Sequence, residues 1–373
     1  MKFSIEDKLV HVGSEAVQYY PPIPFINLRI GLLHYYETYS IIRGKANFPY
    51  FKINGAEHVL ESERTHSYIS KYFITITSIH SFYEHLLNNV LDSGKLQLSY
   101  IQGREQDDFV ALLAGKHEVI KIGGKTLDYN VKLKRLALMY KLEESIPLEL
   151  RLSEAYKFLL NHINTLEMLA LLRNDIVHKG DRTLLRYDFE CFMVNKIIPL
   201  LVDTLTLLAK SKVYIQKALY CKLNVLEELR KLTLPFEVKD IIYSEINEKL
   251  KHINHLKELG RASFSNPLWM KADAISDEHW KNIKSQHNDS IVFEAMQQAE
   301  KLLGISGYFF QNCCPCCGAE TFVMYDLNFY KQTNISRVET GKCTLCSYSI
   351  NVMLGEPSKY KILFNSIFID PEI

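Results

Sequence analysis

Two pairs of cysteines near the C-terminus have the spacing of metal ligands. Cys314 and Cys317 stand in the run Cys-Pro-Cys-Cys-Gly, and Cys343 and Cys346 form a second Cys-x-x-Cys pair after a gap of 25 residues. Thiolates in two such turns bind Zn²⁺ tetrahedrally, and a site closed by four protein ligands has no position for a reactive water. We therefore expect these cysteines to hold a structural zinc ion and expect no zinc catalysis.

A competing pair of ligands lies one residue earlier. Cys313 and Cys316 have the same Cys-x-x-Cys spacing. Gly318 follows Cys317 and suits the tight turn of a zinc knuckle, because glycine adopts a positive φ without strain. We therefore prefer Cys314 and Cys317 as ligands. Six of the eight cysteines lie between residues 313 and 346, which favours metal ligation over disulfide bonds.

A second group of residues that could take part in a reaction lies at the end of a long helical pattern. Arg173 interrupts an apolar arc on a wheel of about 100° per residue. The arc consists of Leu159, Ile163, Leu166, Leu169, Ala170, Ile176 and Val177. His178 lies about 140° from Arg173, in the last turn before Gly180. A guanidinium can hold two phosphate oxygens, and the helix dipole favours a protonated imidazole in the last turn, which suits a proton donor.

The run Leu172-Arg173-Asn174-Asp175-Ile176-Val177-His178 resembles the R-x(4-6)-H motif of the HEPN superfamily. The resemblance covers about residues 66–211. It implies a four-helix bundle in which the motif ends a long helix. It also implies a metal-independent endoribonuclease, often dimeric, of the kind found in toxin–antitoxin, phage-defence and RNA-processing systems. By this resemblance Arg173 and His178 would be the catalytic pair, with Asn174 as a supporting polar group.

The implied reaction needs the residue types that the motif contains. RNA would be cleaved by attack of a 2'-hydroxyl on the neighbouring phosphate, with an imidazole moving protons and a guanidinium stabilising charge. An antitoxin or a defence-system protein is a further implied partner. Because Arg173 and His178 diverge by about 140° on one helix, we expect a homodimer in which each arginine lies near the partner's histidine.

Other interpretations of these residues stand beside this one. Arg173 could pair with a buried carboxylate such as Glu84 or Glu167, and ordinary helices also end on His and Lys before Gly. The protein would then be a non-catalytic HEPN-like dimeric scaffold, or an adaptor that binds nucleic acid or protein through its zinc ribbon. A DNA-binding ribbon fits less well with the neutral overall charge.

Three further histidines are candidate functional groups. His80 and Glu84 are four residues apart on an earlier helix and could line the same cleft as Arg173, although such pairs more often form a solvated helix edge. His252 and His255 share a face of a highly charged helix, and we expect both on the surface.

The elements that must position these groups are mainly α. We expect helices over residues 72–91, 129–142, 153–179, 187–211, 213–231, 237–259 and 290–303, with loops between about 103 and 124. Short connections between long amphipathic helices predict antiparallel neighbours in a bundle. Strand formers at 320–330, 348–354 and 360–369 predict a small β zinc ribbon.

These elements suggest a HEPN-like four-helix core with helical extensions, followed by the ribbon. The expected units are an N-terminal helical extension (1–65), the HEPN-like bundle (66–211), a charged helical region (212–304) and the zinc ribbon (305–373). We expect the bundle and the ribbon to have separate cores, and the ribbon to be too small to fold without its metal.

Composition bounds the class of protein. The 373 residues are 47% hydrophobic and 23% charged, as in an ordinary globular protein. A formal net charge of +1 produces no overall electrostatic field that would attract polyanions. Contact with nucleic acid would therefore depend on local clusters of Lys and Arg. We find no signal-peptide pattern and no apolar run of the roughly 18 residues that span a bilayer. We therefore expect a cytoplasmic protein without a membrane segment.

Overall fold

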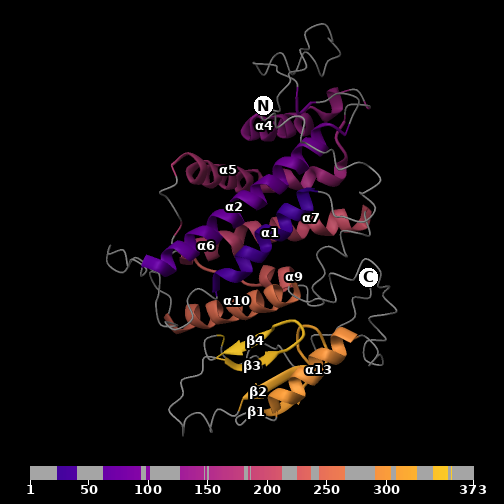
Figure 1. Ribbon diagram of the computed structural model, residues 1–373. Helices are drawn as coiled ribbons and strands as arrows, with labels where there is room; N and C mark the ends of the chain where they lie inside the picture. Colours follow the sequence, from indigo (N-terminus) through magenta and orange to yellow (C-terminus); the bar gives the residue numbers. More distant parts are fainter. Residues whose placement is uncertain are drawn as a thin grey trace, which may run out of the picture.

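The described part of the chain is a stack of helices with a small antiparallel sheet at one end (Figure 1). This computed structural model describes residues 23–39, 62–93, 98–100, 127–146, 148, 151–179, 184, 186–211, 225–236, 243–264, 290–303, 308–325, 339–351 and 354. The prediction of a mainly α protein with a small β ribbon is confirmed. The expectation of separate cores is not met, because buried apolar side chains of helices and sheet belong to one contiguous cluster.

The central helix of the stack is α2 (Ser62–Leu91). α1 (Ile23–Glu37) lies along it, while α4 (Tyr129–Lys141) and α5 (Ile163–His178) also pack on it. α1 also packs against a helix from the expected charged region, α10. The N-terminal segment is therefore part of the helical core.

One long apolar helix is built from three pieces. α6 (Arg186–Phe192), a π-helical turn (η8, Met193–Ile197) and α7 (Ile198–Ser211) follow one another without a break. In the described part of the chain, Arg186–Leu208 alone is long and apolar enough to cross a membrane. However, 61% of its apolar 18-residue stretch is buried inside the protein. Phe189 within it is fully buried. This helix is therefore a core element of the helical stack.

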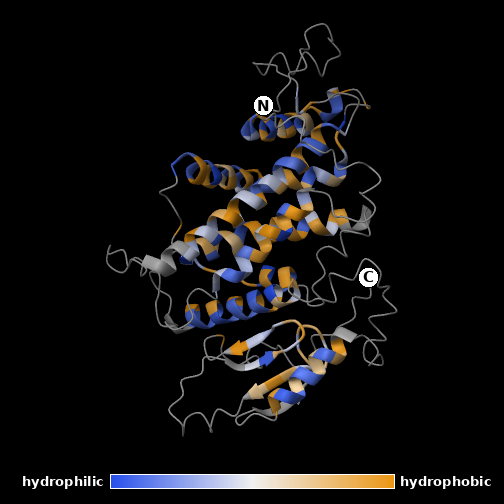
Figure 2. Ribbon diagram, viewed as in Figure 1, coloured by the Kyte–Doolittle hydropathy of each residue, from blue (hydrophilic) through white to orange (hydrophobic). Residues whose placement is uncertain are grey.

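α10 (Tyr243–Phe264) lies between the other helices and the sheet (Figure 1). Figure 2 shows it as largely hydrophilic despite this position. Its side chains His255, Lys257 and Glu258 are fully buried. The charged residues in the second half of α10 therefore form an internal polar layer, whereas Glu245 and Lys249 in its first half are exposed.

α10 also continues beyond the predicted end at residue 259. A Cβ atom on Gly260 would lie 2.5 Å from the ring of Tyr36, so only glycine allows α1 to approach this closely. Gly260 therefore marks a helix contact, and the helix runs on to Phe264. The short helix α9 (Val225–Arg230) packs against α10 and α7.

The sheet contains four antiparallel strands in sequential order. They are β1 (Tyr308–Asn312), β2 (Phe322–Tyr325), β3 (Glu339–Cys343) and β4 (Ser349–Asn351). α13 (Ser290–Leu303) packs against β1 and β2. β2 and β4 fall within predicted strands, whereas β1 and β3 lie outside them.

The predicted helix over 153–179 is two elements. A 3₁₀ segment, η7 (Glu154–His162), precedes α5, and Ser153 caps it by accepting a hydrogen bond from the amide of Ala155 at 3.3 Å. At the junction, Nε2 of His162 lies 3.2 Å from Oδ2 of Asp203 on α7, so the last residue of the tighter helix is tied to α7. Arg173 and His178 both lie in α5, so the angle between them is unaffected.

Several expectations lie partly or wholly outside the described residues. These are the loops over 103–124, the first part of the helix at 213–231 and the strand at 360–369. A second 3₁₀ turn, η5 (Glu143–Ser145), follows α4. The boundaries 1–65, 66–211, 212–304 and 305–373 remain predictions.

Candidate functional site

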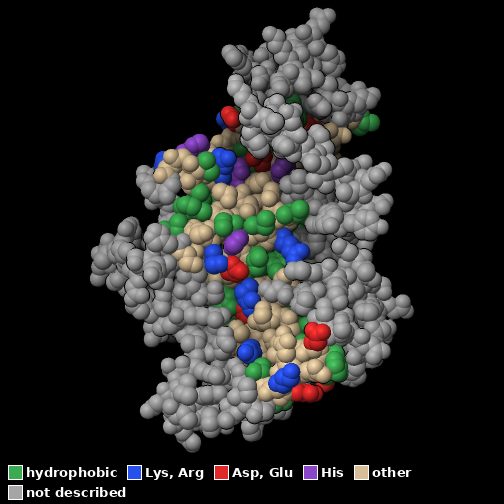
Figure 3. All heavy atoms as spheres, in the orientation of Figure 1, with side chains coloured by type: hydrophobic (Ala, Val, Ile, Leu, Met, Phe, Trp, Pro, Cys, Tyr) green, Lys and Arg blue, Asp and Glu red, His purple; other side chains and the backbone are tan. Residues whose placement is uncertain are grey.

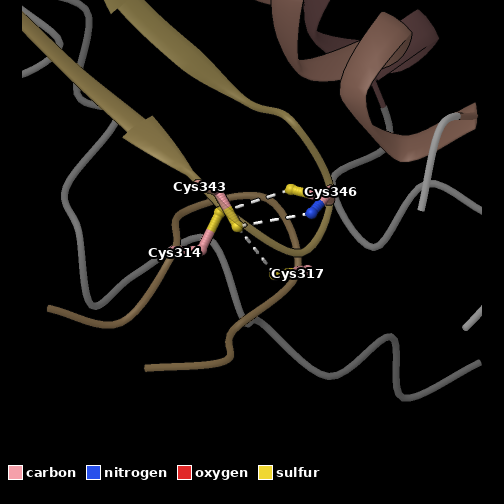
Figure 4. A group of neighbouring side chains, drawn as sticks. All are labelled: Cys314, Cys317, Cys343 and Cys346. Carbon is pink, nitrogen blue, oxygen red and sulfur yellow. Dashed lines mark hydrogen bonds between the residues drawn. The ribbon is translucent and has the colours of Figure 1, made fainter. Parts of the chain in front are cut away.

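Four buried cysteines meet where two turns of the sheet region face each other (Figure 4). The sulfur atoms of Cys314, Cys317, Cys343 and Cys346 all lie within 4.8 Å of one another. Sγ of Cys314 is 3.5 Å from Sγ of Cys346, and Sγ of Cys317 is 3.7 Å from Sγ of Cys343. A tetrahedron with Zn–S bonds of about 2.3 Å has edges of about 3.8 Å. The cluster therefore has the donor set and the size to hold a metal ion such as zinc.

The backbone of both turns is shaped around these sulfur atoms. Gly318 has a φ of 76°, and its amide donates to the carbonyl of Cys314 at 2.8 Å. Ser347 takes the equivalent place after Cys346, with a φ of 59°. The amide of Cys346 donates to Sγ of Cys343 at 3.4 Å. The glycine that favoured this register thus adopts the expected left-handed conformation.

Cys316 of the competing register lies outside the cluster. Its thiol donates to the backbone carbonyl of Leu259 in α10 at 3.6 Å. Within the cluster, burial and the hydrogen bonds that each thiol donates to neighbouring sulfur atoms raise the pKa of Cys314 and Cys346 well above the ordinary value. A divalent cation would offset this effect, because it stabilises thiolates directly.

Glu258 joins the sheet to the helices. Its fully buried carboxylate accepts hydrogen bonds from the Ser349 amide at 2.7 Å and from the Ser349 hydroxyl at 3.3 Å. Nε and Nη2 of Arg261 each donate to it at 2.6 Å, and the Tyr39 hydroxyl is a further donor. Removing the carboxylate would leave several buried donors unpaired, which is costly.

A second buried ionic pair holds α1, α6 and α10 together. The Lys257 ammonium donates to Glu190 and, at 2.9 Å, to Oγ1 of Thr38. It also lies 4.1 Å from the ring centre of Tyr35, whose hydroxyl donates to Glu190 at 3.1 Å. Burial lowers the pKa of Lys257 to about 8, although the Glu190 carboxylate opposes this change.

The expectation that His255 lies on the surface is wrong. The side chain is fully buried, and its Nε2 lies 2.7 Å from the hydroxyl of Tyr348, the residue before β4. Burial lowers the pKa of His255 to about 4. His252, by contrast, is partly exposed. The polar pattern of α10 is misleading because its side chains bond to one another and to the sheet.

The Arg-His motif ends α5, as expected, but its two side chains lie in different surroundings. Arg173 is half-buried, and its Nη1 donates to Oδ1 of Asn174 at 3.1 Å, whereas His178 is exposed in the last turn. Among the described residues no carboxylate, Glu167 included, forms an ion pair with Arg173, and Glu84 pairs instead with Lys132 at 3.2 Å. The structure thus brings Asn174, but not His178, to the guanidinium within one chain.

Most of the apolar arc that Arg173 interrupts faces the bundle. Leu166, Leu169, Ala170 and Ile176 are buried there. The large apolar side chains that α5 exposes are Met168, Leu171 and Val177, at 44%, 61% and 51% exposure. Met168, Leu171 and His178 share the outward face of α5, whereas Val177 is the one residue of the arc that is exposed.

A polar cluster surrounds the inner side of Arg173, where α2, α4 and α5 meet. It consists of His80, Glu84, Tyr129, Lys132 and Arg173. The ring centres of His80 and Tyr129 are 4.4 Å apart, and both Tyr129 and Lys132 are buried. Burial lowers the pKa of His80 to about 4; Glu84 opposes this change, and the charges of Arg173 and Lys132 add to it. Figure 3 shows histidine, cationic and acidic side chains gathered at the level of α4 and α5.

No family model, curated protein or solved structure matches this chain. Function therefore has to follow from the chemistry of the described residues. Sequence reasoning identifies His80 and Glu84 but misses Lys132 and Tyr129. A signal is present: Tyr129, Leu133 and Leu136 form a buried stripe at helical spacing, and Lys132 lies on that stripe. A lysine on an apolar face indicates a buried partner.

We expect His80 to make folding stability depend on pH. Its folded pKa of about 4 lies below its unfolded value of about 6.5, so unfolding takes up a proton between these pH values. Stability conferred by the neutral ring is complete above about pH 6.5 and is lost as the pH falls toward 4. The loss between pH 7 and pH 5 should be about 2 kcal/mol.

Urea unfolding at pH 7 and pH 5 measures this effect. His80→Gln should reduce the pH difference by about 2 kcal/mol, while His85→Gln, at an exposed position of the same helix, should leave it unchanged. Equal pH differences in the wild type and in His80→Gln would show that His80 does not contribute.

Proposed function

We propose that this protein is a metal-independent endoribonuclease of HEPN type that acts in the cytoplasm as a toxin or phage-defence effector. The observation that carries the proposal is the half-buried Arg173, which has a hydrogen bond to Asn174 and no carboxylate partner among the described residues. Such a guanidinium keeps N–H donors for the oxygens of a phosphate. Asn174 orients it, and His178 donates a proton to the leaving oxygen.

The proposal includes a homodimer. Arg173 lies on the inner side of α5 and His178 on its outward face, so a second copy has to bring its own histidine to the arginine. The exposed side chains of Met168 and Leu171 accompany His178 on that face and would be covered by the second copy.

In this proposal the cysteine cluster holds zinc as a structural ion. The four thiolates fill the tetrahedral positions, so the ion stabilises the sheet and takes no part in cleavage. The sheet region is the surface through which an antitoxin or a defence-system protein is recognised. If the protein has no nuclease activity, the second candidate function is a dimeric scaffold that uses this ribbon as an adaptor.

We expect purified protein to cleave single-stranded RNA in the presence of EDTA. The Arg-His chemistry needs no divalent ion, and Arg173→Ala should lower the rate at least about 100-fold because the guanidinium stabilises the transition state. Product analysis by gel electrophoresis checks this, with zinc content and circular dichroism measured after each assay.

Arg151→Ala is a suitable control, because Arg151 is exposed and lies outside α5. It should cleave RNA like the wild type. Cleavage that requires added magnesium while the protein stays folded would refute the mechanism. A folded wild type without activity would favour the scaffold.

A further inference from the structure

Cleavage of RNA by its own 2'-hydroxyl requires two proton transfers. One group takes the proton of the 2'-hydroxyl, and another gives a proton to the departing 5'-oxygen. His178 lies in the last turn of α5, where the helix dipole favours the protonated imidazole and hence the donor role. A proton acceptor is missing from the Arg-His motif, and assigning one rests on the proposed nuclease function.

His80, on α2, lies close enough to Arg173, on α5, for the arginine charge to act on its imidazole. It is 5% exposed, and its ring packs 4.4 Å from the ring centre of Tyr129. The Tyr129 hydroxyl is buried and has no hydrogen-bond partner among the described residues. A buried hydroxyl without a partner is rare in folded proteins, so this one indicates that a ligand or water oxygen belongs beside it.

Each element packed around His80 contributes a charged or titratable group. Glu84 comes from α2, Tyr129 and Lys132 from α4, and Arg173 from α5. Lys132 donates to the Glu84 carboxylate at 3.2 Å and neutralises it, which leaves Arg173 as the uncompensated charge of the cluster. A bound phosphate would meet this charge.

The same surroundings keep the His80 ring neutral. Burial is the main reason that its pKa falls to about 4, and Arg173 and Lys132 lower it further against the effect of Glu84. A neutral imidazole has a free lone pair for a proton. A phosphate bound to Arg173 adds negative charge nearby, which raises the pKa of His80 toward the working pH and strengthens it as a base.

We infer that His80 is the proton acceptor of the cleavage reaction and that Arg173 and the Tyr129 hydroxyl hold the phosphodiester beside it. His80 takes the 2'-hydroxyl proton as the bond from O2' to phosphorus forms. The bond from phosphorus to O5' then breaks, and His178 of a second copy gives its proton to the 5'-oxygen. The products are a 2',3'-cyclic phosphate and a 5'-hydroxyl. Exchange with water returns both histidines to their initial states.

The test compares two RNA substrates that differ in one atom. In the second substrate, sulfur replaces the bridging 5'-oxygen at the cleavage site, so the leaving group departs without protonation. His178→Ala should cleave ordinary RNA at least about 100-fold more slowly than the wild type but recover on the sulfur substrate. His80→Gln should be about as slow on ordinary RNA and stay slow on the sulfur substrate, because the 2'-hydroxyl still needs a base.

Two further measurements separate catalysis from folding. His80→Gln should lose the acidic limb of the pH–rate profile, which a merely structural change would not remove, while His85→Gln should behave as the wild type. If His80→Gln does not fold by circular dichroism, Tyr129→Phe keeps the ring contact and should lower kcat/KM about 10-fold through the lost hydroxyl.

The outcomes distinguish this inference from the function it rests on. A wild type that cleaves neither substrate overturns both. A wild type that cleaves RNA, together with a folded His80→Gln that is equally active or is restored by the sulfur substrate, overturns the role of His80 alone. Persistent loss on both substrates in His80→Gln, with recovery in His178→Ala, supports it.

Discussion

Replacing Cys343 with serine should release the metal and unfold the sheet while most of the helical signal remains. The four strands are short, and zinc bound by four thiolates contributes about 10–16 kcal/mol of apparent free energy to small folds of this kind. The helical stack retains its own buried side chains, including the Lys257–Glu190 pair. Far-UV circular dichroism, zinc analysis and limited proteolysis from about residue 305 onward measure the three parts of this result.

The helices should nevertheless become less stable. When β4 unfolds, Glu258 loses the Ser349 amide and hydroxyl, and His255 loses the Tyr348 hydroxyl. Hydrogen bonds to a charged group contribute about 1.5–3 kcal/mol each, so losing the two bonds to Glu258 should lower the unfolding free energy of the helices by about 3–6 kcal/mol. The cysteine cluster, when it holds a metal ion, would thus act on the stability of the bundle through α10.

Cys316→Ser is the matched control, because Cys316 lies in the same turn but outside the cluster. It should retain one zinc ion per chain and a folded sheet. Complete loss of the helical signal in Cys343→Ser would mean that the stack cannot fold without the sheet. A protease-resistant, metal-free sheet in Cys343→Ser would show that metal does not hold this region.

The cysteine cluster can be predicted from the sequence because its determinants are local. Cys314, Cys317 and Gly318 lie in one turn, and the glycine identifies the register because a positive φ is needed at its position. The pairing of the two turns then follows from the need for four thiolates around one ion. The contact between the two Cys-x-x-Cys turns is the one long-range feature of the cluster, and it can be predicted because one metal ion would need all four thiolates.

The interior of the helical stack could not be predicted in the same way. A polar residue on a helix is assigned to the surface by its type, yet Glu258 and Lys257 are buried because their partners come from α1, α6 and β4. Gly260 resembles a helix end in the sequence because the ring that it accommodates, Tyr36, is 224 positions earlier in the chain. Such contacts leave no periodic pattern within the helix.

The candidate site around Arg173 also combines residues that can be predicted locally with neighbours that depend on long-range packing. The sequence identifies Arg173, Asn174 and His178 from their spacing, and α5 sets the angle between them. The neighbours of Arg173 depend on how α2 and α4 pack against α5, so the surroundings of His80 emerge only in the structure. The packing of α5 on the bundle also buries Leu166 and Leu169, and so decides which of its side chains face outward.

Arg173→Ala and His178→Ala should each be inactive alone and regain activity when mixed. In the composite site, the arginine of the His178→Ala chain meets the histidine of the Arg173→Ala chain. Random exchange makes half of the dimers mixed, and each mixed dimer has one intact site of two, so about a quarter of the wild-type activity should return. RNA cleavage after subunit exchange, verified by mass spectrometry of differently labelled chains, measures this recovery.

The double variant Arg173→Ala/His178→Ala gives the opposite signature. Mixed with wild-type protein, it forms dimers in which each intact residue faces an altered partner, so both sites are dead and excess double variant should suppress the wild type. If Arg173 and His178 worked within one chain, the wild-type subunit of a mixed dimer would stay active and the two single variants would not restore each other. Recovery in the first mixture together with suppression in the second is therefore required of a site shared between two copies, and an active wild-type monomer would exclude it.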